Sequence, residues 1–314
     1  MGPTWVARWR SSSAGWWCSS CSCNSSGAEP STGWWCSVAE QIKTLSPLRE
    51  DLRASRILLR AGWHAAMSYR VSFFSAILGG MVLQGTQLLF IGVLLAKFNV
   101  IDGWRLNDIA FLFGMRLAAH AFYVVPFGAL ISIDQAIQQG DVDRYLLRPA
   151  GTYLQVVTRH APLMALGDAL LGFGAVAVFA PQASVDWTPG KVAFLIAAVV
   201  GGGLVETGMQ TFLSGLSFRM TSTMSLRILA DDTITQFSGY PLTMFSRWGF
   251  LSLTFIFPMA FIAYLPATVL LDRTGDLPIP AWLAYVSPAG GLVVFAIGLV
   301  FFNRMIRSYT SPGS

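Results

Sequence analysis

The stretch VSFFSAILGGMVLQGTQLLFIGVLLA, Val71–Ala96, lies between Arg70 and Lys97 and contains no charged residue. A helix of about 20 apolar residues is long enough to cross the roughly 30 Å hydrocarbon core of a bilayer. The stretch is too long for a barrel strand, and it lacks the alternating polar pattern of one. It therefore predicts a membrane-spanning helix.

Five later stretches have the same character. They are Ile109–Ile133, Ala161–Ala180, Val192–Phe218, Phe250–Leu271 and Trp282–Phe302. Together with the first, they predict an all-α membrane protein with six transmembrane helices, within a transmembrane domain spanning residues 71–307. A short tail, residues 308–314, follows the last helix.

The composition agrees with a membrane protein. Of the 314 residues, 54% are hydrophobic and 12% are charged, and the mean hydropathy is +0.56. Ordinary soluble domains carry about 25% charged residues. Lys and Arg outnumber Asp and Glu by 21 to 16, but the basic residues flank apolar runs instead of clustering on a soluble face. Nucleic acid is therefore not a predicted partner.

The basic residues also predict an orientation, because short loops rich in Lys and Arg stay in the cytoplasm. With a cytoplasmic N-terminus, four of them fall on the outer side, namely Lys97, Arg105, Lys191 and Arg273. Fourteen fall on the cytoplasmic side, namely Lys43, Arg49, Arg53, Arg56, Arg60, Arg70, Arg144, Arg148, Arg159, Arg219, Arg227, Arg247, Arg304 and Arg307. Both termini are thus predicted to be cytoplasmic.

The N-terminal region differs from the rest of the chain. Residues 1–45 are rich in Ser and Trp and contain all four cysteines, Cys18, Cys21, Cys23 and Cys36. Zinc binding is one reading, but the cysteines lack the paired spacing of a zinc site. We expect no metal and a disordered leader, which is either native or outside the natural reading frame.

Residues 46–70 predict a helix, with Ser46 as N-cap and Pro47 in the first turn. Its arginines, Arg49, Arg53, Arg56 and Arg60, recur at steps of four, three and four and form one stripe. Such a helix can lie among anionic lipid headgroups. The alternative is a solvated charged face on an ordinary helix.

The loop between the second and third predicted spans reads SIDQAIQQGDVDRYLLRPAGTY, from Ser132 to Tyr153. Gly140 is suited to end a short helix, because glycine tolerates the left-handed conformation. In the turn that follows, Leu146 and Leu147 stand among charged residues. From the residues alone, the loop is equally well explained as a compact amphipathic structure and as a simple connector between the two spans.

The segment GDVDRYLLRP, Gly140–Pro149, resembles the G-x-[LV]-D-x-[YF]-L-[LV]-[KR]-P signature of ABC-2 type permeases. Asp102–Trp104 and Tyr240–Leu271 also resemble that family, and the resemblance extends from Leu48 to Arg307. It implies a half-permease of the bacterial cytoplasmic membrane, like the transmembrane domain of a type V exporter. The implied partners are an ATP-binding cassette subunit in two copies and a second permease, either a related chain or a second copy.

The resemblance also implies two functional segments. The arginine-striped helix would be an elbow helix before the first span. The loop would couple the permease to the ATPase through Gln138, Gln139, Gly140, Asp141, Asp143, Arg144, Tyr145, Leu146, Leu147, Arg148 and Pro149.

The chain has no phosphate-binding loop of its own. That loop needs a G-x-x-x-x-G-K-[ST] sequence, and none of the three lysines, Lys43, Lys97 and Lys191, stands in one. We therefore predict no catalytic residue and no bound cofactor. ATP and Mg would bind to the partner subunit.

Four ionisable side chains, Arg116, His120, Asp168 and Glu206, fall inside predicted spans. A charge at mid-membrane costs about 2.5–3.5 kcal/mol, so these groups should face protein or water. They predict either a polar transport path or internal pairing of Arg116 with Asp168 or Glu206.

Pro258 and Pro266 predict kinks in the fifth span, because each removes a backbone hydrogen bond. The kinks could be static bends or part of an outer gate. Glycines of the fourth span, Gly201, Gly202, Gly203, Gly208 and Gly215, predict close helix packing.

Two other functional classes have less support in the sequence. A stand-alone secondary transporter or channel should show inverted repeats, which are not evident. A membrane enzyme should show a nucleophile or metal motif, and neither G-x-S-x-G nor H-E-x-x-H is present. We expect a hydrophobic or amphipathic small-molecule substrate and membrane lipid as a partner, and the resemblance implies outward transport.

Overall fold

The computed structural model describes residues 60, 64, 67–97, 100–101, 103–148, 151–159, 162–220 and 222–309, all within one compact unit, Glu50–Ser314. The predicted leader, residues 1–45, lies outside these residues. So do Arg49, Arg53 and Arg56 of the predicted elbow helix, whereas Arg60 is helical and exposed.

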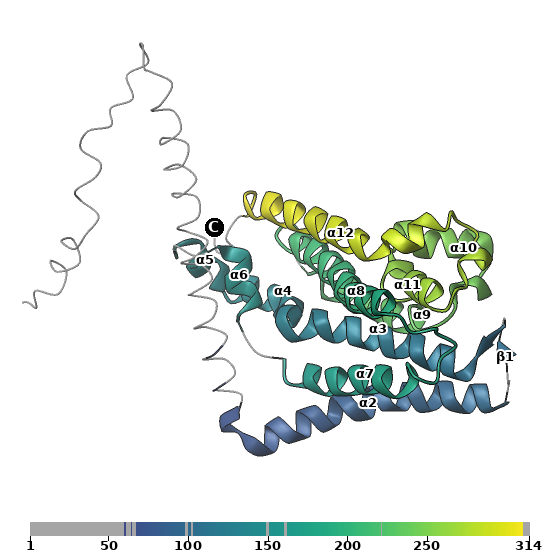
Figure 1. Ribbon diagram of the computed structural model, residues 1–314. Coiled ribbons are helices and arrows are strands. Elements are labelled where there is room, and N and C mark those ends of the chain that lie inside the picture. The colour runs from purple at the N-terminus through teal and green to yellow at the C-terminus, as the bar shows by residue number, and fades with distance from the viewer. Residues whose placement is uncertain are drawn as a thin grey trace, which may run out of the picture. The chain divides into compact units, whose positions relative to one another are not determined.

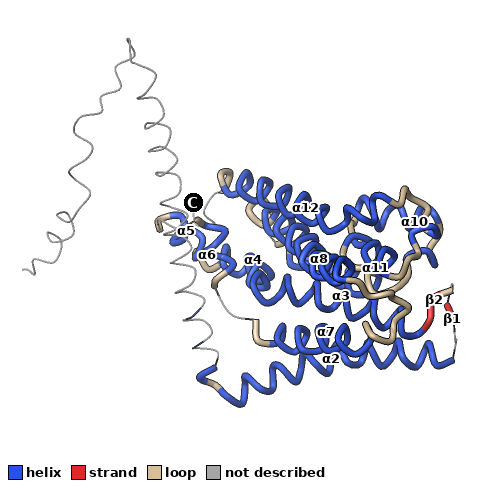
Figure 2. The backbone as a smooth tube through the Cα atoms, in the orientation of Figure 1, coloured by secondary structure: helices blue, strands red, loops and turns tan. Residues whose placement is uncertain are grey.

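Helices make up most of the described chain (Figure 2). The α-helices are α2 Arg70–Lys97, α3 Leu106–Phe127, α4 Ile133–Gln138, α5 Asp141–Leu146, α6 Thr152–Val157, α7 Met164–Phe179, α8 Pro189–Leu216, α9 Met224–Phe237, α10 Arg247–Leu251, α11 Tyr264–Leu270 and α12 Trp282–Ile306. Two short strands, β1 Val100–Ile101 and β2 Trp104–Arg105, pair antiparallel with Val100 opposite Arg105.

Shorter helical turns join the main helices. They are η1 Gly128–Ser132, η2 Leu242–Met244, η4 Met259–Phe261 and η5 Thr274–Asp276, together with the π-helical turn η3 Ser252–Ile256. The predicted all-α membrane fold is therefore confirmed in its class.

Four helical segments of the described chain are long and apolar enough to cross a membrane. They are Arg70–Phe90, Asn107–Gln138, Pro189–Leu216 and Trp282–Ile306. The second of these includes α3, η1 and α4. The predicted span Ala161–Ala180 corresponds to α7, which is apolar but has only 16 residues.

The long helices pack side by side along their length. In Figure 1, α7 lies between α2 and α3, and α12 lies against α8. The predicted close packing at the glycines of α8 is present. Glycines spaced seven residues apart line the contact between α8 and α12. Gly201 and Gly208 of α8 meet the backbone of Gly291 and Gly298 of α12. Added Cβ atoms would not fit, so these glycines allow the two backbones to touch.

The predicted span over Phe250–Leu271 is not one continuous helix. The structure has two segments there, Arg247–Ile256 and Met259–Leu270, which meet at an angle of 78°. The break lies at Phe257 and Pro258, where proline has no N–H to continue the helix. Pro266, the second predicted kink, instead lies in the first turn of α11. Backbone N–H groups in the first turn make no hydrogen bond within the helix, so a proline there breaks none.

Both outer ends of this bent pair lie at the same end of the molecule. Arg247, which begins the first segment, lines a cavity with Trp104, Asp276 and Pro278. The break at Pro258 lies partway along α8 and α12, where Pro258 lines a cavity with Gly208 and Val294. The pair thus enters the bundle and returns. Arg247, predicted on the cytoplasmic side, lies instead at the end that carries Trp104.

Helix α9 runs antiparallel to α3 for most of its length. Thr223, just before α9, contacts Asp134, and Arg227 contacts the carbonyl of Leu130. Farther along, Thr235 contacts Arg116. The chain between Thr223 and Thr243, which includes α9, therefore passes from the loop end of the bundle to the end that carries Trp104, before the bent pair begins.

Candidate functional site

The predicted coupling loop forms a compact pair of short helices at one end of the bundle. Helix α4 ends at Gln138, and Gly140 follows in the left-handed conformation with φ 71°. Glycine adopts this conformation without the steric penalty of a Cβ atom. The turn reverses the chain so that α5 can fold back, and Figure 1 places α4, α5 and α6 together near the C-terminal end of α12.

One face of this loop is anchored in the protein. Val142 and Tyr145 are buried in a cluster with Leu130 and Val156, among others, and the cluster includes Phe218 of the α8 end and Phe302 of α12. Burial raises the pKa of the Tyr145 phenol. These contacts join the loop to the C-terminal ends of α8 and α12.

Polar contacts hold the same loop from the side. Arg159 Nη2 donates to Asp141 Oδ2 at 2.9 Å and to Gln139 Oε1 at 2.7 Å. Gln155 Nε2 donates to the carbonyl of Tyr145 at 3.0 Å. Arg144 makes a longer contact with Asp141, at 3.5 Å. The loop is therefore held by polar contacts at several points.

The opposite face of the loop is apolar and open. Leu146 is 49% exposed and Leu147 is 87% exposed. Arg144 and Arg148 are also exposed, whereas Pro149 lies outside the described residues. Two open leucines between arginines, on a braced support, form a surface suited to a protein partner.

The four ionisable groups predicted inside spans do not all meet as expected. Glu206 of α8 pairs with His120 of α3, and Glu206 Oε2 lies 2.8 Å from His120 Nδ1. Arg116 Nη2 donates instead to Thr235 Oγ1 of α9, at 2.7 Å. The predicted pairing of Arg116 with Glu206 is therefore replaced by a His120 pair. All three ionisable side chains are buried.

Polar atoms around this pair remain without hydrogen-bond partners in the described chain. They are Nε and Nη1 of Arg116 and Oε1 of Glu206. Asp168 of α7 is buried and interacts electrostatically with Arg116 and His120. Buried polar atoms of this kind usually bind water or a ligand. The group is thus a polar centre in the middle of an apolar bundle.

Sequence reasoning missed a polar stripe that faces α3. Thr223, Arg227, Asp231 and Thr235 follow one another at steps of four and so share one face of α9. Their spacing was the signal that could have revealed them. The stripe runs from Asp134 at the loop to Arg116 at the polar centre.

Two of the cavities that border α9 differ in character. One, of about 280 Å³, is lined by Thr86, Gln87 and Phe90 of α2, by Phe113 of α3, and by Thr235, Gln236 and Tyr240. The other, of about 540 Å³, is almost wholly apolar and lies between α8, α9, α12 and the tip at Pro258. The first cavity adjoins the polar centre, because Thr235 belongs to both.

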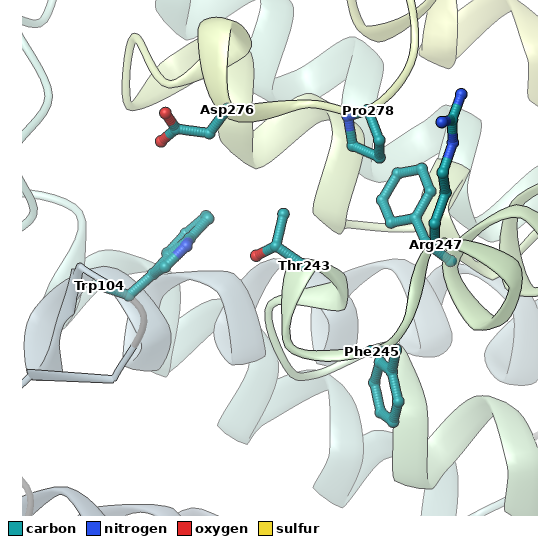
Figure 3. A pocket seen from close by; sticks show the side chains of 7 residues that line it. Trp104, Thr243, Phe245, Arg247, Asp276 and Pro278 are labelled. Carbon is teal, nitrogen blue, oxygen red and sulfur yellow. The ribbon is translucent and has the colours of Figure 1, made fainter.

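A third cavity, of about 520 Å³, lies at the end opposite the loop (Figure 3). Thr243 lies between Trp104 and Arg247, and the charged ends of Arg247 and Asp276 point away from each other. Arg273 lies over the Trp104 ring, 5.1 Å from its centroid, and donates to the carbonyl of Gly103. These contacts fasten the bent pair and the segment after it to the start of α3.

Comparison with known proteins gives one match. The model of a family described as ABC-2 family transporter protein matches residues 81–313. The match covers most of the chain and includes the loop, the polar centre and the bent pair. No curated protein and no solved structure matches.

Proposed function

Because this chain belongs to the ABC-2 family of transporter proteins, we propose that it is the transmembrane half of an exporter driven by a separate ATPase. Membership makes the chain a multi-pass membrane permease of an ABC transport system. Such a permease partners an ABC ATPase and is not itself an enzyme. The proposal adds the route of coupling, the arrangement of partners and the direction of transport.

The proposed topology has six crossings, by α2, α3, α7, α8, α9 and α12. In this topology α9 takes the place of the span predicted over Phe250–Leu271, because the chain from Thr223 to Thr243 leads from Asp134 at the loop end to Trp104 at the other end. The loop end then lies in the cytoplasm, with both termini, and the bent pair enters from outside. The density of arginines around the loop supports this orientation in a bacterial cytoplasmic membrane.

The exposed Leu146 and Leu147 carry the proposal of a coupling loop. In water, an open leucine pair on a braced helix turn favours burial against a partner. The arginines beside it can form ion pairs at the rim of the contact. The surface suits a groove on the ATPase, which would bind ATP and Mg.

The polar side chains on α9 and α2 support a second permease across a transport path. Asp232 and Gln236 of α9 are exposed at the depth of the polar centre, and Thr86 of α2 is exposed near them. A charge facing lipid costs about 2.5–3.5 kcal/mol, so this face requires water or protein. A second permease, with a path between the two, would provide both.

The proposed mechanism follows from this arrangement. Nucleotide-driven closure of two ATPase subunits would move the loops that they hold and tilt the helices between inward-facing and outward-facing states. The apolar and aromatic linings of the cavities favour a hydrophobic or amphipathic substrate. The bent pair at Pro258 would act as an outer gate.

Co-purification of the native protein in mild detergent tests the proposal. We expect an ATP-binding cassette subunit and a permease, as a related chain or a second copy, in stoichiometric amounts. A label attached to the loop should be accessible only from the cytoplasm. A purified chain that transports without any ATPase would refute the proposal and favour a secondary transporter.

A further inference from the structure

Asp134 lies at the start of α4, just before the coupling loop, and joins it to the start of α9. Its carboxylate accepts the backbone N–H of Thr223 at 3.1 Å and the Thr223 hydroxyl at 3.2 Å. It also forms an ion pair with Arg227, at 2.7 Å. Arg227 in turn donates through Nη1 to the carbonyl of Leu130 at 2.5 Å. Asp134, Thr223 and Arg227 are all buried.

This contact has a physical reason to be strong. The first N–H groups of a helix have no partners within the helix, and its N-terminus carries a partial positive charge. Thr223 is the N-cap of α9, so the carboxylate of Asp134 lies where the α9 dipole attracts an anion. Arg227, one turn into α9, adds a full positive charge. The hydroxyl of Ser217, after α8, also meets the hydroxyl of Thr223 at 2.6 Å.

The loop side of the contact is braced. Force applied at Leu147 passes through α5 to α4, because Val142 is buried and Asp141 is tied to Arg159. Asp134 of α4 makes the next polar contact, with Thr223 at the start of α9. Beyond it lies α9, whose exposed face carries Asp232 and Gln236.

We propose that Asp134 and Arg227 are positioning residues that link movement of the coupling loop to movement of α9. The inference rests on the proposed function and extends it, because it assigns the transmission step to one buried pair. When the ATPase moves the loop, α4 carries Asp134 with it. The start of α9 follows, since both its N-cap and its first arginine are bound to that carboxylate.

A purely structural role would give a different result. A pair that only stabilises the fold would lower the melting temperature when broken, but would leave the nucleotide-driven movement of α9 unchanged. The discriminating measurement is therefore the movement of α9 in an assembled complex.

The experiment uses the full chain with its ATPase, in nanodiscs, with the four native cysteines replaced by serine. A single reporter, Gln236→Cys, lies on α9 beside the cavity shared with α2. Its rate of reaction with a charged methanethiosulfonate reagent is measured without nucleotide and with ATP and vanadate. The ratio of the two rates reports movement of α9.

In the parent complex we expect this ratio to differ clearly from one. In Asp134→Asn it should fall to about one with bound ATPase retained, because the nucleotide then no longer shifts the α9 population. Asp134→Glu, which keeps the carboxylate, should restore part of the ratio. Lys191→Gln breaks a different ion pair, with Asp272, and should leave the ratio at the parent value.

A second variant covers the case in which Asp134→Asn fails to fold. The double change Asp134→Asn with Arg227→Gln leaves no unpaired buried charge and should fold. Its ratio should also be about one. A parent ratio retained in either folded variant overturns the inference. A parent chain that binds no ATPase overturns the proposed function itself, and the inference with it.

Discussion

Replacement of Leu146 and Leu147 should separate the permease from its ATPase without unfolding it. Full burial of a leucine side chain is worth roughly 1.5–3 kcal/mol. With 49% and 87% of these residues open, docking can bury enough apolar surface to contribute about 2–4 kcal/mol. At 1.4 kcal/mol for each tenfold change, Leu146→Ala with Leu147→Ala should weaken binding by roughly 30-fold to 1,000-fold.

The fold should tolerate this change. Exposed surface substitutions usually alter the free energy of unfolding by no more than about 0.5 kcal/mol. The loop keeps its buried anchors, Val142 and Tyr145, in the double variant. The melting temperature of the detergent-solubilised permease should therefore match that of the parent.

The assay is titration of the purified ATPase against the permease in nanodiscs. Gln135→Ala is the matched control, because Gln135 is exposed on α4, just before the coupling residues, and contributes little apolar surface. Leu146→Asp with Leu147→Asp should abolish binding, since docking would then bury two carboxylates. An affinity of the double alanine variant within about twofold of the parent affinity would refute the reasoning, because so small a loss is far below the expected one.

Three further predictions concern stability. Gly208→Ala should lower the melting temperature, because a Cβ there would lie 2.6 Å from the Val294 carbonyl carbon; Gly174→Ala, with open space around it, is the control and should raise it slightly. His120→Gln and Glu206→Gln should each lower the melting temperature. The double variant should show a decrease smaller than the sum of the two single decreases, and additive decreases would argue against the pairing of His120 with Glu206. Burial raises the pKa of the Tyr153 phenol to about 12, whereas the phenol ionises near pH 10 in the unfolded chain. The free energy of unfolding should therefore fall between pH 10 and 12, and it should fall less in Tyr153→Phe.

Several features of this protein are local and could be predicted from composition and spacing. Apolar length identifies α2, α8 and α12, because a long and predominantly apolar helix finds a suitable solvent in the bilayer. The loop around Gly140 was also predictable, since glycine is the residue best suited to the left-handed turn. Its open leucines were visible as apolar residues among charged ones.

Other features depend on contacts between distant segments. Composition suggested one span over Phe250–Leu271, yet Pro258 divides this stretch and both of its ends return to the Trp104 end. Apolarity measures only whether a segment can enter lipid, and a re-entrant pair satisfies that requirement as well as a crossing helix does. Packing of Tyr264 against Trp104 and Phe250 helps hold the returning half in place.

The partners of the buried charges were likewise settled by packing. Arg116 and His120 share one face of α3, and either could have met Glu206 on charge alone. The close contact of Gly203 with Ala119 and Phe122 sets the register of α8 against α3, and in that register Glu206 meets His120. Apolar length and turn residues act over one or two helical turns, so they are readable along the chain. Pairing across helices depends on which backbones touch, and only the folded bundle decides that.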